Sequence, residues 1–115
     1  MKKKILVTRR LLIENEEKLK ELFDVKLNSK DELYTSDKII ELSKDCDGIL
    51  SAITDQINKD LIEKLSPTVK IIANFAVGFG NINVNAATKK NIVVTNTPEV
   101  LDDSTAAVAY IHLTR

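Results

Sequence analysis

The stretch VKIIANFAVGFGNINVNAATKKNIVV, residues 69–94, carries the clearest indication of the fold class. It begins with a short run, residues 69–73, whose apolar residues suit a central parallel strand that is covered on both faces. A loop with two glycines follows, residues 83–90 then predict a short helix, and residues 92–94 predict another strand. Two strands joined through a helix are the repeating unit of a parallel sheet with right-handed crossovers.

The same alternation of short apolar runs and longer amphipathic segments continues on both sides of this stretch. Asp47 and Gly48 predict a turn into a buried strand, Thr35 or Ser36 is expected to cap a helix, and Asp102 or Asp103 to begin a final helix. We therefore predict an α/β protein with a flavodoxin-like three-layer fold, in which helices cover both faces of a five-stranded parallel sheet. The remaining expected elements are strands at 5–7, 23–27 and 49–50, and helices at 14–22, 36–43 and 58–65.

Composition excludes several classes of protein. The 115 residues fit one domain, and 43% of them are hydrophobic, which is enough for a core. Seventeen basic residues balance seventeen acidic ones, so no net charge attracts nucleic acid or an anionic membrane, and neither partner is expected. No run approaches the roughly 20 apolar residues that cross a bilayer, and we predict a cytoplasmic protein. The single cysteine, Cys46, is expected to be a buried apolar residue, and no metal site is predicted.

Ligands of such sheets gather outside the carboxyl ends of the strands, so three loops matter: residues 8–11, 51–54 and 75–81. Only the last has glycines, Gly78 and Gly80, spaced so that backbone N–H groups can approach an anion. The order Gly78-x-Gly80-x-x-Asn83 lacks the third glycine of a dinucleotide fingerprint, which disfavours a dinucleotide here. An anion site and a glycine turn without a ligand both remain open on the residues alone.

The stretch IIANFAVGFGNINVNAATKKNIVVTNTPEVLDDSTA, residues 71–106, resembles the substrate domain of the D-isomer-specific 2-hydroxyacid dehydrogenases. This group includes glyoxylate and hydroxypyruvate reductases, D-lactate dehydrogenases and phosphoglycerate dehydrogenases. The likeness rests on the order of several short motifs, and the earlier segment DGILS before a helix also fits the family. The motifs are residues 76–79, 86–88, 95–98 and 104–106. The resemblance covers essentially the whole chain and implies the same flavodoxin-like fold.

The resemblance also implies an activity and a site. Family members reduce a 2-oxo acid, or oxidise a D-2-hydroxy acid, by hydride transfer with NAD or NADP. It implies that the backbone amides of Val77 and Gly78 hold the substrate carboxylate, that Phe79 belongs to the same loop site, and that Leu50 and Ser51 form the opposite wall. It places Thr105 near the cofactor. Its partner is a small 2-oxo or 2-hydroxy carboxylate.

The chain departs from the family pattern in charge and in length. Gly80, Asn83 and Ala107 stand where family members usually carry acidic residues. The family's second domain brings the glycine-rich dinucleotide loop and the Arg, Glu and His that act on the substrate, and the sequence contains no such domain. We therefore expect residues 1–101 to form the substrate domain and residues 102–115 to begin the helix that leads to the missing cofactor domain.

On this interpretation the chain is the N-terminal portion of a truncated dehydrogenase, it binds no cofactor by itself and it is inactive alone. His112, the only histidine, is expected to be structural. Two alternatives are a free-standing domain that binds small carboxylates and one subunit of a split enzyme. A homodimer through residues 106–113, which carry an apolar stripe, is a further hypothesis.

A phosphoacceptor receiver domain is the natural rival, because it shares the architecture. It requires an acidic cluster after the first strand and an Asp at the end of the third. The chain has Thr8, Arg9 and Arg10 at the first place and Leu50 and Ser51 at the second, which argues against a receiver.

Overall fold

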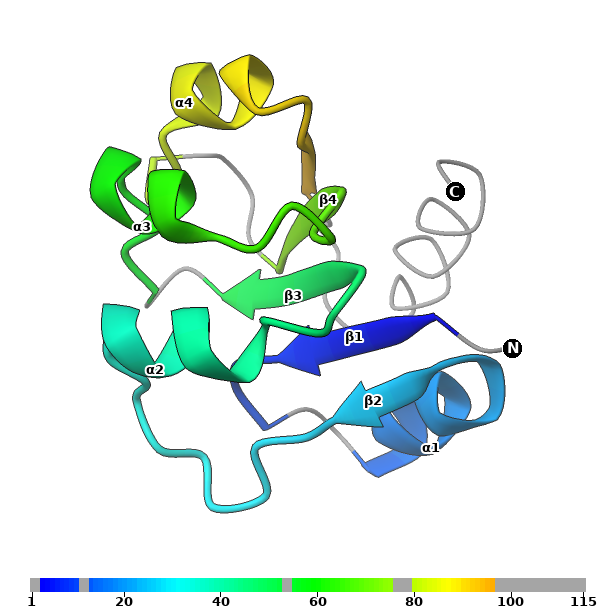
Figure 1. Ribbon diagram of the computed structural model, residues 1–115. Helices are drawn as coiled ribbons and strands as arrows, with labels where there is room; N and C mark the ends of the chain where they lie inside the picture. The colour runs from blue at the N-terminus through cyan, green and yellow to red at the C-terminus, as the bar shows by residue number, and fades with distance from the viewer. Residues whose placement is uncertain (1–2, 11–12, 53–54, 76–79, 97–115) are drawn as a thin grey trace.

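A computed structural model describes residues 3–10, 13–52, 55–75 and 80–96. Within these ranges the chain forms a sheet of five parallel strands in the order β2-β1-β3-β4-β5 (Figure 1). This order confirms the predicted flavodoxin-like fold. The strands are β1 (Lys4–Val7), β2 (Asp24–Lys26), β3 (Gly48–Ala52), β4 (Ile71–Phe75) and β5 (Val93–Asn96).

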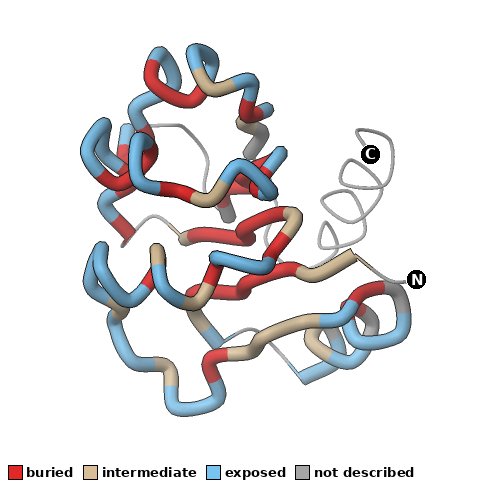
Figure 2. The backbone as a smooth tube through the Cα atoms, in the orientation of Figure 1, coloured by how far each residue is buried: buried red, intermediate tan, exposed pale blue. Residues whose placement is uncertain are grey.

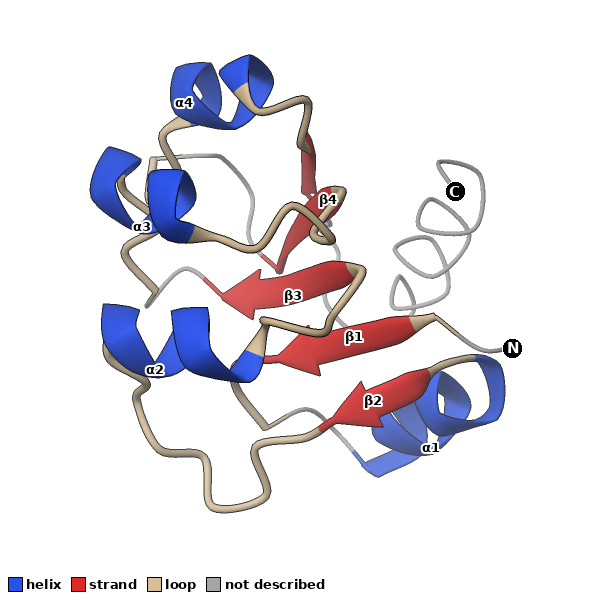
Figure 3. Cartoon of the chain, in the orientation of Figure 1, coloured by secondary structure: helices blue, strands red, loops and turns tan. Residues whose placement is uncertain are grey.

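In the described ranges, four helices connect the strands and cover both faces of the sheet (Figure 3). Helix α1 packs on one face, where Leu19 joins the core, and the other three helices pack on the opposite face. The sheet is thus the middle layer of three, as predicted. The helices are α1 (Ile13–Leu22), α2 (Ser36–Leu42), α3 (Lys59–Lys64) and α4 (Val84–Lys89).

The core follows the alternation of side chains along the strands. Leu6, Ile49 and Ile72 face α2, α3 and α4, whereas Val7 and Leu50 face the side covered by α1. All five are buried, and buried backbone runs along the central strands β1, β3 and β4 (Figure 2). A sheet buried on both faces explains why these strands read as apolar runs rather than as alternating ones.

Asx and hydroxyl caps begin three of the helices. The side chain of Thr35 accepts a hydrogen bond from the amide of Lys38, so Thr35, and not Ser36, is the cap of α2. Asn58 caps α3 and Asn83 caps α4 in the same way. These caps explain why the predicted and observed starts of the helices agree to within a residue.

Two predictions at strand ends need correction. Gly48 is the first residue of β3 and not a turn residue, because it pairs with Ile71 where a side chain would crowd the neighbouring strand. The strand predicted at 69–73 lies at Ile71–Phe75, since its start is set by this pairing with β3 and not by local sequence. The predicted final helix and the homodimer through residues 106–113 lie outside the described residues.

Candidate functional site

A row of polar side chains lies at the carboxyl ends of three adjacent strands. Thr8, Ser51 and Asn74 each come two residues after a core residue of β1, β3 or β4, so they share the sheet face that α2, α3 and α4 cover. Their exposed fractions are 0%, 1% and 0%. Because buried polar groups are costly unless they are hydrogen-bonded, this row must be held in a network.

Ser51, Asn74 and Asn81 form the centre of that network. The Ser51 hydroxyl donates to Oδ1 of Asn74 at 3.0 Å, beside which Ser51 lies in the β3–β4 register. The amide of Asn74 donates from Nδ2 to Oδ1 of Asn81 at 2.8 Å, and Nδ2 of Asn81 donates back to Oδ1 of Asn74 at 3.2 Å. The same Asn81 nitrogen also donates to the backbone oxygens of Ala52, at 3.0 Å, and Asp55, at 2.9 Å.

Asp55 closes the network toward β1. Its carboxylate oxygen Oδ2 accepts a hydrogen bond from the Thr8 hydroxyl and another, of 2.9 Å, from the backbone amide of Ala52. The side chain is buried, and its other oxygen, Oδ1, has no hydrogen-bond partner. Through this one carboxylate, the loop after β3 is therefore bonded both to the end of β3 and to the residue that follows β1.

An isolated backbone bridge also holds the segment that contains Asp55. Ile57 and Ile82 form an isolated parallel bridge, in which the Ile57 amide donates to the oxygen of Asn81 at 2.8 Å. The amide of Asn83 donates to the oxygen of Ile57 at 2.9 Å. The segment that follows β3 and the segment that precedes α4 are thus joined through both backbone and side chains.

An ion pair lies just beyond the carboxyl end of β1. The Arg9 guanidinium donates to both carboxylate oxygens of Asp31, at 2.8 and 3.2 Å, and the backbone amide of Arg10 donates to the same carboxylate at 2.9 Å. These bonds lower the pKa of Asp31 to about 2. Asn28, which is buried, ties this corner to the row of polar side chains by donating to the backbone oxygen of Thr8 at 2.8 Å.

The residues predicted for the site divide into two groups. Leu50 and Ser51 lie in β3 and are buried: Leu50 packs in the core on the α1 side, and Ser51 bonds to Asn74 on the other side. Val77, Gly78, Phe79 and Thr105 lie outside the described residues, so their roles stay predictions.

Sequence reasoning missed Asn74, Asn81, Asp55 and Thr8 as members of this network. One signal was present, because Asn74 is a polar residue directly after an apolar run, at the place where a strand of a parallel sheet meets its ligand edge. Several of the contacts, such as Thr8 with Asp55 and Asn81 with Ala52, join segments far apart in the sequence, and only the fold brings these segments together.

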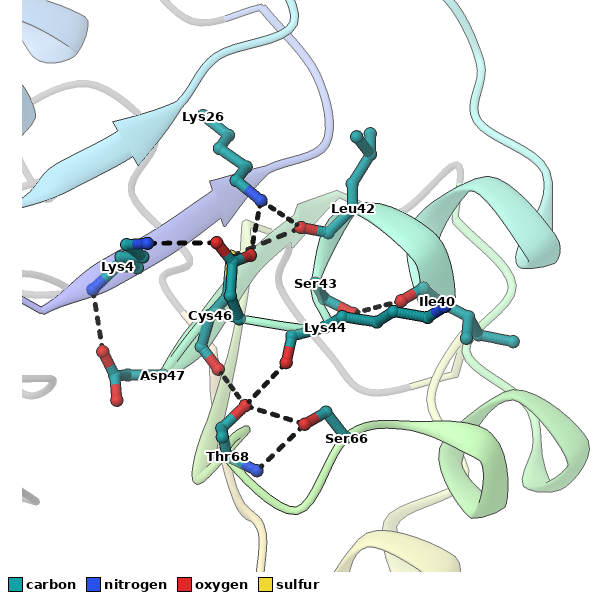
Figure 4. A network of polar contacts seen from close by, with 11 residues as sticks. Lys4, Lys26, Ile40, Leu42, Ser43, Lys44, Cys46, Asp47, Ser66 and Thr68 are labelled. Atoms are coloured by element: carbon teal, nitrogen blue, oxygen red, sulfur yellow. Dashed lines mark hydrogen bonds and ion pairs between the residues drawn. The ribbon is translucent and has the colours of Figure 1, made fainter.

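A second polar cluster lies at the opposite edge, near the amino ends of β1 and β3 (Figure 4). Asp45 accepts hydrogen bonds from Nζ of Lys26 at 2.5 Å and from Nζ of Lys4 at 3.0 Å, which lower its pKa to about 2. The hydroxyl of Thr68, which precedes β4, donates to the oxygen of Cys46 at 2.8 Å. The side chains that make these contacts are exposed or half-exposed and come from different segments of the chain. We assign the contacts a structural role.

The described ranges were also considered for metal ligands and for membrane-spanning helices, with the following result. No group of three or more His, Cys, Asp or Glu side chains there is arranged to hold a metal ion. None of the helices in those ranges has the length and apolar character needed to span a lipid bilayer.

The chain matches the family model of the D-isomer specific 2-hydroxyacid dehydrogenase catalytic domain over residues 5–111. It is 44% identical over 111 residues to a glyoxylate reductase of Korarchaeum cryptofilum, covering 96% of this chain and 33% of the relative. It is 36% identical over 110 residues to a glyoxylate reductase of Pyrococcus furiosus, covering 96% and 32%.

Solved structures agree with this match. A Polaromonas protein assigned to the NAD-binding D-isomer specific 2-hydroxyacid dehydrogenases superposes with a TM-score of 0.82 at 31% identity, over 96% of this chain and 35% of that one. The NAD+-bound 3-phosphoglycerate dehydrogenase of Entamoeba histolytica superposes with a TM-score of 0.72 at 28% identity, over 85% and 33%.

The chain therefore belongs to the D-isomer specific 2-hydroxyacid dehydrogenase family and corresponds to its catalytic domain. The resemblance inferred from the motifs in residues 71–106 is confirmed. The chain spans about a third of the length of the curated relatives that it matches.

Proposed function

We propose that this chain is the substrate-binding portion of an NAD(P)-dependent 2-hydroxyacid dehydrogenase, and that its ligand is glyoxylate or a similarly small 2-oxo acid. The observation that carries the proposal is the buried network of Ser51, Asn74 and Asn81 at the carboxyl edge of the sheet, within a chain of this family. Glyoxylate is chosen because the relatives from Korarchaeum cryptofilum and Pyrococcus furiosus, at 44% and 36% identity, are glyoxylate reductases.

In this proposal the backbone amides of Val77 and Gly78 receive the substrate carboxylate. Successive N–H groups beside a glycine form a concave anion site without a charged side chain having to be desolvated. Leu50, Ser51 and Phe79 complete the site. Support for this comes from the positions of Asn74 and Asn81, which bond to each other and lie on either side of residues 75–80, so that the chain before and after the proposed cradle is held in place.

The residues at the end of β1 bear on where the cofactor binds. A dinucleotide needs a glycine-rich turn after the first strand, with N–H groups turned toward its phosphates. The turn after β1 has instead Thr8, whose hydroxyl is used by Asp55, and Arg9, whose guanidinium is paired with Asp31. These described residues do not fit the cofactor, and we propose that NAD or NADP binds to a further part of the whole enzyme, with Thr105 at the boundary.

The remaining chemistry of this chain is then binding and orientation. The reaction needs the 2-oxo acid to be held by its carboxylate so that its carbonyl carbon faces one direction. Backbone amides suit this task, because a hydride donor supplied from elsewhere then meets a substrate that is already oriented.

A titration of the 15N-labelled chain with sodium glyoxylate tests the proposal. We expect amide shifts to gather at residues 50–52 and 75–82, and no comparable shifts with glycolaldehyde, which lacks the carboxylate. Shifts elsewhere on the chain, or equal responses to both compounds, would contradict a carboxylate site at this edge. A separate assay of NADH oxidation by the chain with glyoxylate is expected to show no activity, because the described residues lack a fit for the cofactor.

A further inference from the structure

We propose that Asn74 and Asn81 are positioning residues, whose reciprocal amide pair fixes the end of β4 against the end of β3 and thereby sets the affinity of this edge for its carboxylate ligand. The inference rests on the proposed function, since it assigns two residues to the same site. Neither side chain is proposed to touch the substrate.

The geometry of the pair is specific to two amides. Each side chain gives one N–H to the other's oxygen and accepts one in return, at 2.8 and 3.2 Å. A carboxylate cannot donate, a hydroxyl is too short to do both, and an apolar residue can do neither. Both side chains are buried, with exposed fractions of 0% for Asn74 and 8% for Asn81, so water does not readily replace a missing partner.

Asn81 does more than close this pair. Its Nδ2 group also faces the backbone oxygens of Ala52 and Asp55, so one side chain joins β4, the end of β3 and the loop that follows β3. Three oxygens converge on a single nitrogen with two hydrogens. Replacing this nitrogen by oxygen would therefore turn three attractive contacts into repulsive ones at the place where β3 and β4 must keep their spacing.

The position of the Asn74–Asn81 pair next to the proposed site is the reason to assign it a role in ligand binding as well as in stability. Ser51 belongs to the proposed wall of the site and bonds to Asn74, and Asn74 and Asn81 are separated by residues 75–80, which contain the proposed cradle. A network of directed hydrogen bonds fixes distances between these segments, whereas apolar packing would tolerate small shifts. Binding of a small ligand depends on such distances to within fractions of an ångström.

The central test is Asn81→Asp, measured by glyoxylate titration of the labelled chain. At neutral pH we expect the dissociation constant to rise about tenfold or more, because the new carboxylate faces the oxygens of Ala52, Asp55 and Asn74. Near about pH 5 part of the affinity should return, since a protonated carboxyl donates one hydrogen bond again. Asn74→Asp should behave alike, because its new oxygen faces Oδ1 of Asn81.

Asn83→Ala is the matched control. Asn83 is exposed and caps α4 through a 3.0 Å bond from the amide of Ala86, so its loss destabilises the fold without entering the network. We expect its glyoxylate affinity to stay within about twofold of the parent. Equal losses of affinity in Asn83→Ala and Asn81→Asp, or an unchanged affinity in folded Asn81→Asp, would overturn the inference.

Two further measurements keep the result decisive. If Asn81→Asp does not fold, Asn81→Ser retains one donor without adding charge, and we expect it to lose affinity by about threefold to tenfold. If the parent chain does not bind glyoxylate, the proposed function of this chain fails. The role of the Asn74–Asn81 pair in holding this part of the fold is then still tested by amide exchange. Exchange of the Ile57 and Asn83 amides, which make the hydrogen bonds of the Ile57–Ile82 bridge beside Asn81, should then speed up about tenfold in Asn81→Ser, while the Ile72 amide in β4 is unchanged. Equal acceleration at Ile72 would mean that the pair supports only global stability, and would overturn the inference.

Discussion

The hydroxyl of Thr8 donates a hydrogen bond to the carboxylate of Asp55, which lies forty-seven positions further along the chain. Both side chains are buried, and the bond joins the end of β1 to the loop after β3. The same carboxylate oxygen accepts from the amide of Ala52, whereas the second oxygen has no hydrogen-bond partner. Burying a carboxylate is costly, so its two hydrogen bonds must offset much of that cost.

The first prediction concerns Asp55→Ala. This change leaves the Thr8 hydroxyl and the Ala52 amide buried without their acceptor, and we expect the free energy of unfolding to fall by about 2–4 kcal/mol. Asp55→Asn keeps one carbonyl oxygen as acceptor and should cost less than Asp55→Ala. Urea unfolding followed by circular dichroism gives both values.

The neighbouring exposed residue provides the control for that experiment. Gln56→Ala should change the free energy of unfolding by no more than about 0.5 kcal/mol, as surface substitutions usually do. If Asp55→Ala is as stable as Gln56→Ala, the carboxylate does not tie β1 to the loop after β3 in the way described.

The second prediction compares two glycines. A methyl group on Gly48 would lie 2.9 Å from Cγ2 of Ile71, 3.2 Å from Cδ1 of Ile5 and 3.3 Å from the Ile71 oxygen. Both isoleucines are buried and β-branched, so they have little room to move, and Gly48→Ala should destabilise the fold by about 1–3 kcal/mol.

Gly80 is the matched position for this test, because a methyl group there meets no atom within 4 Å. We expect Gly80→Ala to be neutral or to stabilise the chain by up to about 1 kcal/mol, through reduced freedom of the unfolded state. Gly80→Asp, which restores the residue usual in the family, should be tolerated as well. Thermal unfolding of the three variants checks the contrast, and a similar loss in Gly48→Ala and Gly80→Ala would contradict it.

The order of strands and helices could be predicted because each element carries its own local signal. Thr35, Asn58 and Asn83 are capping residues in front of amphipathic segments, and the apolar runs of β1, β3 and β4 suit strands buried on both faces. Strand ends could not be predicted equally well. The start of β4 depends on the pairing of Gly48 with Ile71, which is a contact between segments far apart in the sequence.

The candidate site was predictable only in part for the same reason. The glycines near residues 78–80 and the family resemblance drew attention to the carboxyl edge of the sheet, and Ser51 does lie in the buried network there. Nothing local marks Asn81 as the partner of Asn74, Ala52 and Asp55, because its role depends on three segments meeting. The roles assigned to Val77, Gly78, Phe79 and Thr105 stay predictions.

The third prediction concerns how the stability contributed by Asp45, near the amino ends of β1 and β3, depends on pH. The hydrogen bonds from Lys26 and Lys4 hold the pKa of Asp45 at about 2, below its ordinary value of 3.8. Because the pKa is lowered by folding, the stability that this carboxylate adds is present above about pH 4 and is lost as the pH falls toward 2. Lys26→Ala should therefore raise the pKa of Asp45 toward 3.8.

The carboxyl carbon shift of Asp45, followed by NMR over acidic pH, measures this pKa directly. Lys38→Ala removes a lysine that is exposed and lies in α2, and it should leave the titration of Asp45 unchanged. An unaltered Asp45 titration in Lys26→Ala would show that the ion pair does not persist in solution.

The fourth prediction concerns Cys46, whose side chain is fully buried between α2 and β3. Its Sγ donates to the oxygen of Leu42 at 3.5 Å, and burial raises the pKa of the thiol. Since the thiolate is the reactive form, Cys46 should resist Ellman's reagent at neutral pH in the folded chain and react rapidly in urea.

The rate at which Cys46 reacts should follow the fraction of unfolded chain. Asp55→Ala, by lowering stability, should therefore speed up the reaction, while Gln56→Ala should not. Rapid and complete reaction of the folded parent would instead mean that the segment around Cys46 opens locally without the core of the sheet.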